Sequence, residues 1–138
     1  MISCVDDLLH MELVSPTGER GVVPTRLLYR AQDPLSVEFL FDDIVRGPVP
    51  WIFARELLAA GMLTPSGDGD VRVWPTGTGP EALLHLALSS PHGSAHLTAA
   101  LTAVERWLRR TYQLVPADRE TEALDLETSL IRFLDGTS

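Results

Sequence analysis

Four histidines are the side chains of this sequence with the widest chemical range. His92 and His96 stand four residues apart, a spacing that on a helix would direct two imidazoles at one zinc ion. Pro91 and Gly93 disfavour a helix there, and no acid or cysteine lies close in sequence to complete the ligands, so we expect no metal site. His85 stands alone in an apolar run, which indicates a core histidine bonded to a backbone group.

Nucleophilic catalysis has no better support in the sequence. Cys4 and His10 fall in one expected strand, about 20 Å apart at 3.3 Å per residue, which is too far for a proton transfer. No G-x-S-x-G segment places a serine for attack. All 11 basic residues are arginine, so no lysine can bind a phosphate or form a Schiff base. We therefore expect neither an enzyme nor a bound cofactor.

Two glycine-containing segments resemble ligand loops only in part. Asp68-Gly69-Asp70 lacks the further acidic ligands of a calcium loop, because Arg72 stands where the next one is needed. Gly67 and Gly69 should instead supply the positive φ angles of a turn. The later G-x-G at residues 77–79 precedes a proline and a strand, not the helix that would bind a pyrophosphate.

The densest basic cluster consists of Arg106, Arg109 and Arg110, with Trp107 beside them. Arginine side chains and an indole ring can together bind single-stranded nucleic acid, by pairing with phosphates and stacking on bases. The net charge of -8 disfavours nucleic acid as a partner. A solvated helix face, paired with the acidic segment 118–127, is the alternative explanation. These arginines are the candidate partner surface of the chain.

A sheet must position most of these side chains, because much of the chain alternates apolar and polar residues with a period of two. Short turns separate the first four runs, which favours antiparallel pairing over parallel crossovers. Pro24 within the second run suggests an edge strand or a late strand start. We predict strands over residues 4–14, 22–30, 35–41, 49–53, 71–74, 82–88 and 94–98.

Three segments have helical character instead. Residues 54–60 are rich in alanine and leucine, and Gly61 follows where a helix often ends in a left-handed residue. Residues 100–112 and 125–134 are amphipathic. The fold class is therefore predicted to be α+β, with a mainly antiparallel sheet of about seven strands, one short internal helix and two C-terminal helices. The predicted core stripe of the second helix is Leu101, Val104, Leu108 and Tyr112.

Composition places these elements in one globular domain over residues 1–138. Of the residues, 45% are apolar and 22% are charged, which is ordinary for a folded domain. No apolar run approaches the roughly 20 residues of a membrane span, so we expect no direct membrane insertion. The first residues include two acids and no base, which is unlike a signal peptide, and the single Cys4 forms no internal disulfide. We expect a cytoplasmic protein.

The stretch over residues 49–75 compresses a strand, a helix, a turn and a strand into one segment. Its W-I-F-A-R-E-L-L-A-A-G and P-S-G-D-G-D-V-R-V-W-P resemble the signature of the SsgA-like proteins of filamentous, spore-forming actinobacteria. The resemblance extends to L-L-Y-R-A-Q-D-P and L-A-L-S-S-P-H-G, and Arg30 departs from it, because the family has an acid there. The signature residues, which we expect to be structural, are Trp51, Phe53, Arg55, Leu57, Leu58, Gly61, Gly67, Asp70, Val71, Trp74 and Pro75.

This resemblance implies a regulator of sporulation-specific cell division with no known catalysis or cofactor. It implies a whirly-like scaffold and a protein that recruits the tubulin-like FtsZ to future septum sites, helps to tether its ring at the membrane and promotes its polymerisation. It also makes another SsgA-like protein a candidate partner and a homotrimer the expected assembly. Open sheet edges, which must be covered or paired, independently favour an oligomer. A single-stranded nucleic-acid-binding module is the alternative function.

Overall fold

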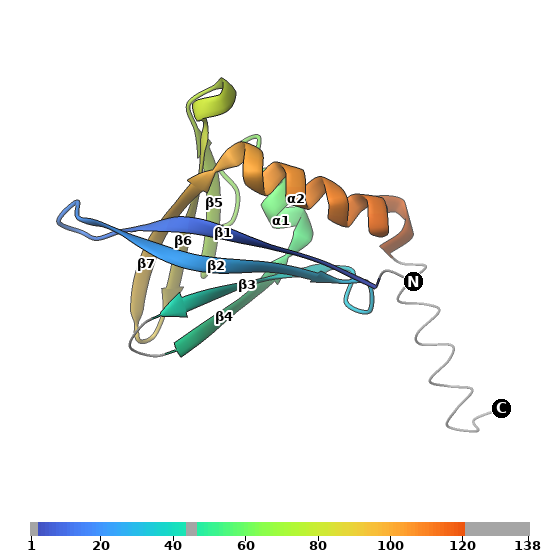
Figure 1. The fold of residues 1–138 in the computed structure, drawn as a ribbon, viewed down its shortest axis with the longest axis horizontal. Coiled ribbons are helices and arrows are strands. Elements are labelled where there is room, and N and C mark those ends of the chain that lie inside the picture. The colour runs from blue at the N-terminus through green and yellow to red at the C-terminus, as the bar shows by residue number, and fades with distance from the viewer. Residues whose placement is uncertain (1–2, 44–46, 121–138) are drawn as a thin grey trace.

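The computed structural model of this chain describes residues 3–43 and 47–120, and Figure 1 shows their fold. One antiparallel sheet of seven strands has the order β4-β3-β2-β1-β7-β6-β5, and two α-helices accompany it. The α+β class and the strand number predicted from the sequence are therefore confirmed. The strands are β1 (Cys4–Val14), β2 (Arg20–Arg30), β3 (Ser36–Asp43), β4 (Gly47–Ala54), β5 (Val71–Thr76), β6 (Leu83–Ser90) and β7 (Gly93–Ala100). The helices are α1 (Arg55–Gly61) and α2 (Leu101–Leu114), with short 3-10 turns η1 (Gly79–Glu81) and η2 (Ala117–Arg119).

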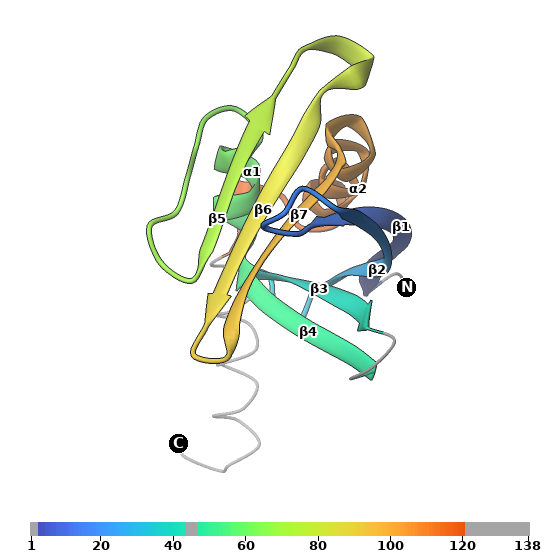
Figure 2. The same cartoon turned by 90° about the vertical axis from the view of Figure 1, so that its left-hand side faces the viewer.

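The sheet curls, so that β3 and β4 cross the direction of β6 and β7, and α2 lies against the inner face (Figure 2). β1 pairs with β2 along its whole length, but it reaches β7 only through Glu12–Val14. Inner-facing side chains alternate along β3 as a period of two requires, where Val37, Phe39 and Phe41 are buried. They form one core with the buried side of α2.

Trp107 lies at the centre of the contact between α2 and the sheet, although the predicted core stripe of this helix did not include it. Its side chain is fully buried, its ring centroid lies 6.2 Å from that of Phe39, and its Nε1–H donates to the backbone oxygen of Val5 over 3.2 Å. Leu101 and Tyr112 are only partly buried. The helix itself was predicted correctly, but its core face is turned toward Trp107, because an indole that buries both its ring and its N–H outweighs the smaller side chains.

Several local predictions need correction. Gly61 is a helical residue of α1 and has no positive φ. Glycine is required there for a different reason, because a Cβ at this position would overlap Val73 of β5. Gly67 has the expected positive φ of 90°, but Gly69 does not. β2 is an internal strand, and Pro24 is tolerated because β2 pairs with β3 only from Thr25 onward. The predicted helix over residues 125–134 lies outside the described residues.

Each edge of the sheet is partly protected within the chain. On β4, Pro48 and Pro50 face β3 partners, and a proline in a paired strand directs its missing N–H away from the partner, toward the free edge. On β5, the backbone of Ser66 exchanges two hydrogen bonds with Val73, of 2.8 and 3.0 Å. These features cover only part of each edge, so the oligomer stays a prediction, and the number three comes from the resemblance alone.

Candidate partner-binding surfaces

Arg55, the first residue of α1, is a fully buried cation. Its Nη1 donates to the backbone oxygen of Thr111 over 3.0 Å, and its Nη2 donates to Oε1 of Glu120 over 2.8 Å. The guanidinium lies over the rings of Tyr29 and Tyr112, 4.7 and 3.9 Å from their centroids. Arginine suits this site because its planar fork can bond two acceptors while its faces stack on aromatic rings.

The two tyrosines of this cluster are held neutral. Burial raises the pKa of Tyr29 to about 12, although the charge of Arg55 acts in the opposite direction. Burial likewise raises the pKa of Tyr112. Since neither phenol ionises near neutral pH, Glu120 is the anion that balances Arg55. The cluster ties α1 to the end of α2, which is a structural role.

Most of the remaining signature residues also support the fold. Phe53 and Leu58 are buried in the core, and a Cβ on Gly67 would overlap the backbone oxygen of Val71. The backbone oxygen of Asp70 accepts a hydrogen bond from Ser89 N–H over 2.8 Å. Leu57 packs against the core from α1. Pro75 does not end its strand but lies within β5, where it pairs with Leu84 of β6. Trp51 and Trp74 are different, because each lies at a surface feature described below.

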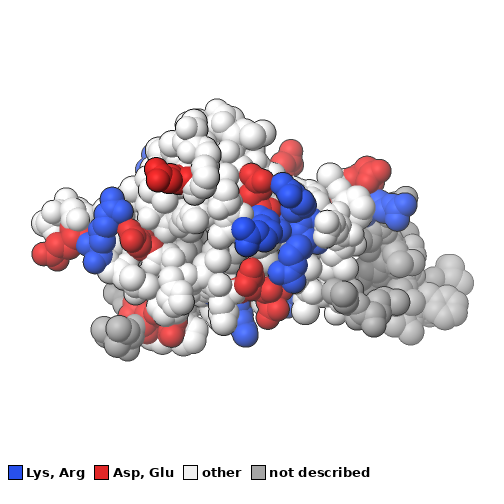
Figure 3. Space-filling view, turned by 45° about the horizontal axis from the view of Figure 1, so that its top comes forward, with Lys and Arg blue, Asp and Glu red and all other residues white. Residues whose placement is uncertain are grey.

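The predicted partner surface on α2 is exposed. Arg106, Arg109 and Arg110 all face solvent, and Arg109 forms an ion pair of 2.9 Å with Glu105. Within residues 3–43 and 47–120, no ion pair involves Arg106 or Arg110. Figure 3 shows basic side chains gathered in the middle of one face, with acidic side chains beside them. Trp107 is buried under this face, so it offers no ring on which a base could stack.

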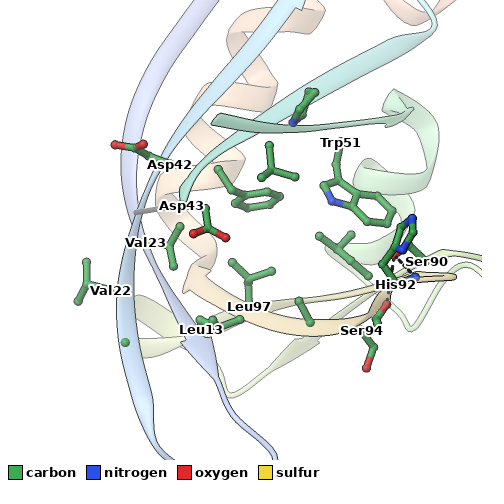
Figure 4. A pocket seen from close by; sticks show the side chains of 17 residues that line it. Leu13, Val22, Val23, Asp42, Asp43, Trp51, Ser90, His92, Ser94 and Leu97 are labelled. Atoms are coloured by element: carbon green, nitrogen blue, oxygen red, sulfur yellow. Dashed lines mark hydrogen bonds between the residues drawn. The ribbon is translucent and has the colours of Figure 1, made fainter. Parts of the chain in front are cut away.

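A groove of about 740 Å³ opens on the inner face of the curled sheet, and no residue of α2 lines it. Its lining is mainly apolar and comes from β1, β2, β3, β4, β6 and β7. Trp51 and Leu97 point into it from opposite walls, and the carboxylate of Asp43 also points inward (Figure 4). Sequence reasoning missed this groove, because its residues come from six strands and no local pattern marks them.

A cluster on the outer face of the sheet was also missed. Trp74 stacks on His85 with ring centroids 5.1 Å apart and an interplanar angle of 9°. His85 Nδ1 lies 2.8 Å from His96 Nε2, and His85 Nε2 lies 2.7 Å from Thr76 Oγ1. The prediction that His85 is a core histidine with a backbone partner was therefore wrong. Its side chain faces outward, between β5 and β7, and bonds to Thr76 and His96. No local signal marked this cluster, because its rings come from three strands.

The described residues do not assemble a metal site. In the part of the chain that the structure describes, no group of three or more histidine, cysteine, aspartate or glutamate side chains could hold a metal ion. His92 lies at the groove and His96 in the outer cluster, so the two do not share a site. Over the same residues, no helix has the length and apolar character needed to cross a membrane.

Comparison with known proteins identifies the family. Residues 23–120 match the model of a family described as the Streptomyces sporulation and cell division protein SsgA. The chain belongs to the SsgA family. The match covers β2 to η2 except for the first residues of β2, and it includes the signature stretch, α2 and Glu120. This is a family of cell-division proteins and not a known family of enzymes.

Relatives within the SsgA family agree over most of the chain. The sporulation-specific cell division protein SsgB of Salinispora tropica is 43% identical over 128 residues, which are 91% of this chain and 90% of that protein. The SsgB of Thermobifida fusca is 40% identical over 126 residues, 90% of each chain. The chain is therefore most simply described as a sporulation cell-division protein of the SsgA family, similar to SsgB.

Solved structures of SsgA-like proteins have the same fold. The crystal structure of an SsgA-like sporulation-specific cell division protein from Thermobifida fusca has a TM-score of 0.87 and 35% identity, and the match covers 95% of this chain and 96% of that one. A structure of SsgB from Streptomyces coelicolor has a TM-score of 0.82 and 40% identity, and the match covers 88% of this chain and 95% of that one. Mutations in that protein are described as correlating to longitudinal cell division during sporulation.

Proposed function

We propose that this SsgA-family protein is a non-enzymatic adaptor that recruits FtsZ to future septum sites during sporulation. In this role it helps to tether the FtsZ ring at the membrane, promotes FtsZ polymerisation and works in the cytoplasm at the septum. The observation that carries the proposal is the 40% identity to SsgB over nine-tenths of both chains. The exposed arginines of α2 supply the surface on which the proposal can be tested.

The basic face of α2 is well suited to orient a partner. The chain as a whole carries a net charge of -8, so an acidic partner is repelled by most of its surface. Arg106 and Arg110 are exposed on one helix and enter no ion pair among the described residues, so they are free to attract acidic groups. Complementary charges of this kind set orientation and association rate more than final affinity. We propose that FtsZ contacts this face.

A co-sedimentation experiment with FtsZ filaments tests both parts of the proposal. The wild-type protein should pellet with filaments, and the double variant Arg106→Ser/Arg110→Ser should pellet several-fold less, with a weaker dependence on salt. Arg26→Ser/Arg30→Ser is the matched control, because it removes two exposed charges from the outer face of β2. Equal loss in both double variants would indicate a general charge effect and contradict the α2 surface. Wild-type protein that stays in the supernatant would contradict the adaptor.

A homotrimer is part of the same proposal. Three identical subunits on one filament would hold it through several weak contacts, because each further contact forms at a high effective concentration. The same geometry allows mixed assemblies with another SsgA-like protein. Light scattering at micromolar concentration should give about three times the subunit mass of 15.1 kDa. A mass equal to one subunit would contradict this assembly and leave the FtsZ proposal to be judged by co-sedimentation.

The data give no support to the single-stranded nucleic-acid alternative. A stacking platform needs an exposed ring near the phosphate-binding cations, and Trp107 is fully buried. Labelled single strands added to the co-sedimentation samples would detect such binding directly. Tight binding at physiological salt, with FtsZ unbound, would reverse the order of the two functions.

A further inference from the structure

Thr76, His85 and His96 form a continuous chain of hydrogen bonds across three strands. Thr76 Oγ1 lies 2.7 Å from His85 Nε2, and His85 Nδ1 lies 2.8 Å from His96 Nε2. The register explains the contact, because Trp74 pairs with His85 and Thr98 pairs with His85 from the other side, which puts His96 diagonally opposite. Thr98, which lies directly opposite His85 on β7, is buried.

The distance between the two facing nitrogens leaves room for one hydrogen. In the neutral pair, one ring donates that hydrogen and the other accepts it. A first added proton can be accommodated, because a charged ring donates more strongly to a neutral one. A second proton would place an N–H on both facing nitrogens, so the bond could not survive. The pair therefore exists with no charge or with one charge, and not with two.

We propose that Thr76, His85 and His96 form a proton-sensitive latch, which joins β5, β6 and β7 on the outer face of the sheet and opens when both histidines are charged. Trp74 is part of the latch, because its ring lies parallel to that of His85 and within 5.4 Å of that of His96. Opening would release the stack as well as the hydrogen bond. β5 is an edge strand, so its side chains have no neighbouring strand on the far side to replace this contact.

The surroundings of the latch oppose the second charge. The pKa of His85 is lowered, and burial is the largest cause, followed by the charges of His96 and Arg20. On the same outer face, β1 contributes His10 and Glu12, β2 contributes Arg20 and β5 contributes Arg72. Glu12 is the only anion in this group, and its carboxylate is paired with Arg20 over 2.8 Å. Asp6 lies farther along the same face of β1 and is paired with Arg26 over 3.9 Å.

The direction of the pH effect follows from the lowered pKa. A histidine whose pKa is lower in the folded than in the unfolded state stabilises the protein at pH values above its ordinary pKa of 6.5. This stability is lost as the pH falls through the pKa of the folded state. The latch should therefore be closed at pH 7 to 8. It should open below pH 6.5, while the groove and the α2 surface keep their structure.

NMR of the full chain with ¹⁵N-labelled histidine tests the latch directly. At pH 8 we expect a scalar coupling between His85 Nδ1 and His96 Nε2 through the shared hydrogen, and its loss at the pH where the second ring becomes charged. His85 should titrate below pH 6.5 in the wild type. In His96→Gln its titration should move upward, because glutamine can accept the bond without adding a charge. His92→Gln, at the groove, is the matched control and should leave the titration of His85 unchanged.

Three results would overturn the latch: no coupling at pH 8, a coupling that persists when both rings are charged, or a titration of His85 that is the same in His96→Gln as in the wild type. The first two are measured on the wild-type protein, so the test stands even if a variant fails to fold. The urea midpoint supplies an independent readout. It should fall as the pH drops below 6.5 in the wild type and fall less in His85→Gln.

Discussion

Arg55 and Glu120 meet through a 2.8 Å ion pair, although 65 positions separate them in the sequence. The guanidinium is fully buried, and the carboxylate is about one-fifth exposed. Arg55 begins the helix of the signature stretch, and Glu120 is the last residue matched by the family model. The pair thus links the centre of the signature to the far end of the matched segment. A second hydrogen bond of Arg55, to the backbone oxygen of Thr111, fixes the end of α2.

Replacing Arg55 by lysine should destabilise the protein strongly. An ammonium group cannot bond Thr111 and Glu120 together while stacking between two tyrosines, so the substitution leaves buried polar groups unpaired. We expect a loss of about 2–4 kcal/mol in the free energy of unfolding, measured by urea denaturation. Arg109→Lys, in the exposed pair with Glu105, is the control and should change it by less than about 0.5 kcal/mol. Similar values for the two variants would show that Arg55 is not a structural centre.

Gly61→Ala should destabilise the protein even though alanine is the better helix former. The new methyl group would overlap Cβ and Cγ1 of Val73, which belong to the short, stiff side chain of a paired strand. Overpacking of this kind costs about 1–3 kcal/mol, against a gain of up to about 1 kcal/mol in helix propensity. Gly69→Ala provides the comparison, because no atom lies within 4 Å of its added Cβ and its φ is not positive. A thermal melt should show a lower Tm for Gly61→Ala alone.

Alkaline unfolding should depend on Tyr29. Burial raises the pKa of its phenol from 10.0, the value in the unfolded state, to about 12. The folded state therefore holds the phenol proton more tightly than the unfolded state does. The stability that this proton contributes is complete below pH 10 and is lost as the pH rises toward 12. Absorbance of the phenolate and circular dichroism should therefore change together above pH 10. In Tyr29→Phe, the unfolding free energy should fall less steeply over the same range, and an unchanged slope would refute this assignment.

Restoring donors to the edge of β4 should promote self-association. The double variant Pro48→Thr/Pro50→Thr adds two N–H groups that point away from β3, and an open edge with unpaired donors and acceptors is a template for another strand. Light scattering should show species larger than those of the wild type, increasing with concentration. Ile52→Thr is the control, because it changes an exposed residue of the same strand and adds no backbone donor. Self-association of the control to the same extent would trace the effect to the side chains.

Local periodicity is what allowed the sheet to be predicted. Val37, Phe39 and Phe41 alternate in the sequence and are buried alternately in the structure, since a strand turns successive side chains to opposite faces. The exposure of Arg106 and Arg110 also followed from the amphipathic pattern of α2. These properties depend on neighbours in the chain, which a sequence displays directly.

The remaining features depend on partners distant in the sequence. His85 lies in a run that is apolar on both faces, so the sequence could not show which face carried Trp74 and His96. Gly61 is compatible with a helix end until Val73 is placed beside it. The groove joins residues of six strands, and the partners of Arg55 come from the C-terminal end of α2 and beyond. Each of these arrangements is set by tertiary packing.

The short contact between β1 and β7 divides the sheet into two meanders, β1 to β4 and β5 to β7, whose strands pair only with sequence neighbours. Hairpins of this kind close small loops, so each meander can form early at a modest entropic cost. Joining Glu12–Val14 to β7 requires closing a loop that contains the whole signature stretch, and α2 packs against both meanders at this junction. The β1–β7 contact is therefore the part of the sheet that we expect to close last in folding and to exchange its amide hydrogens first.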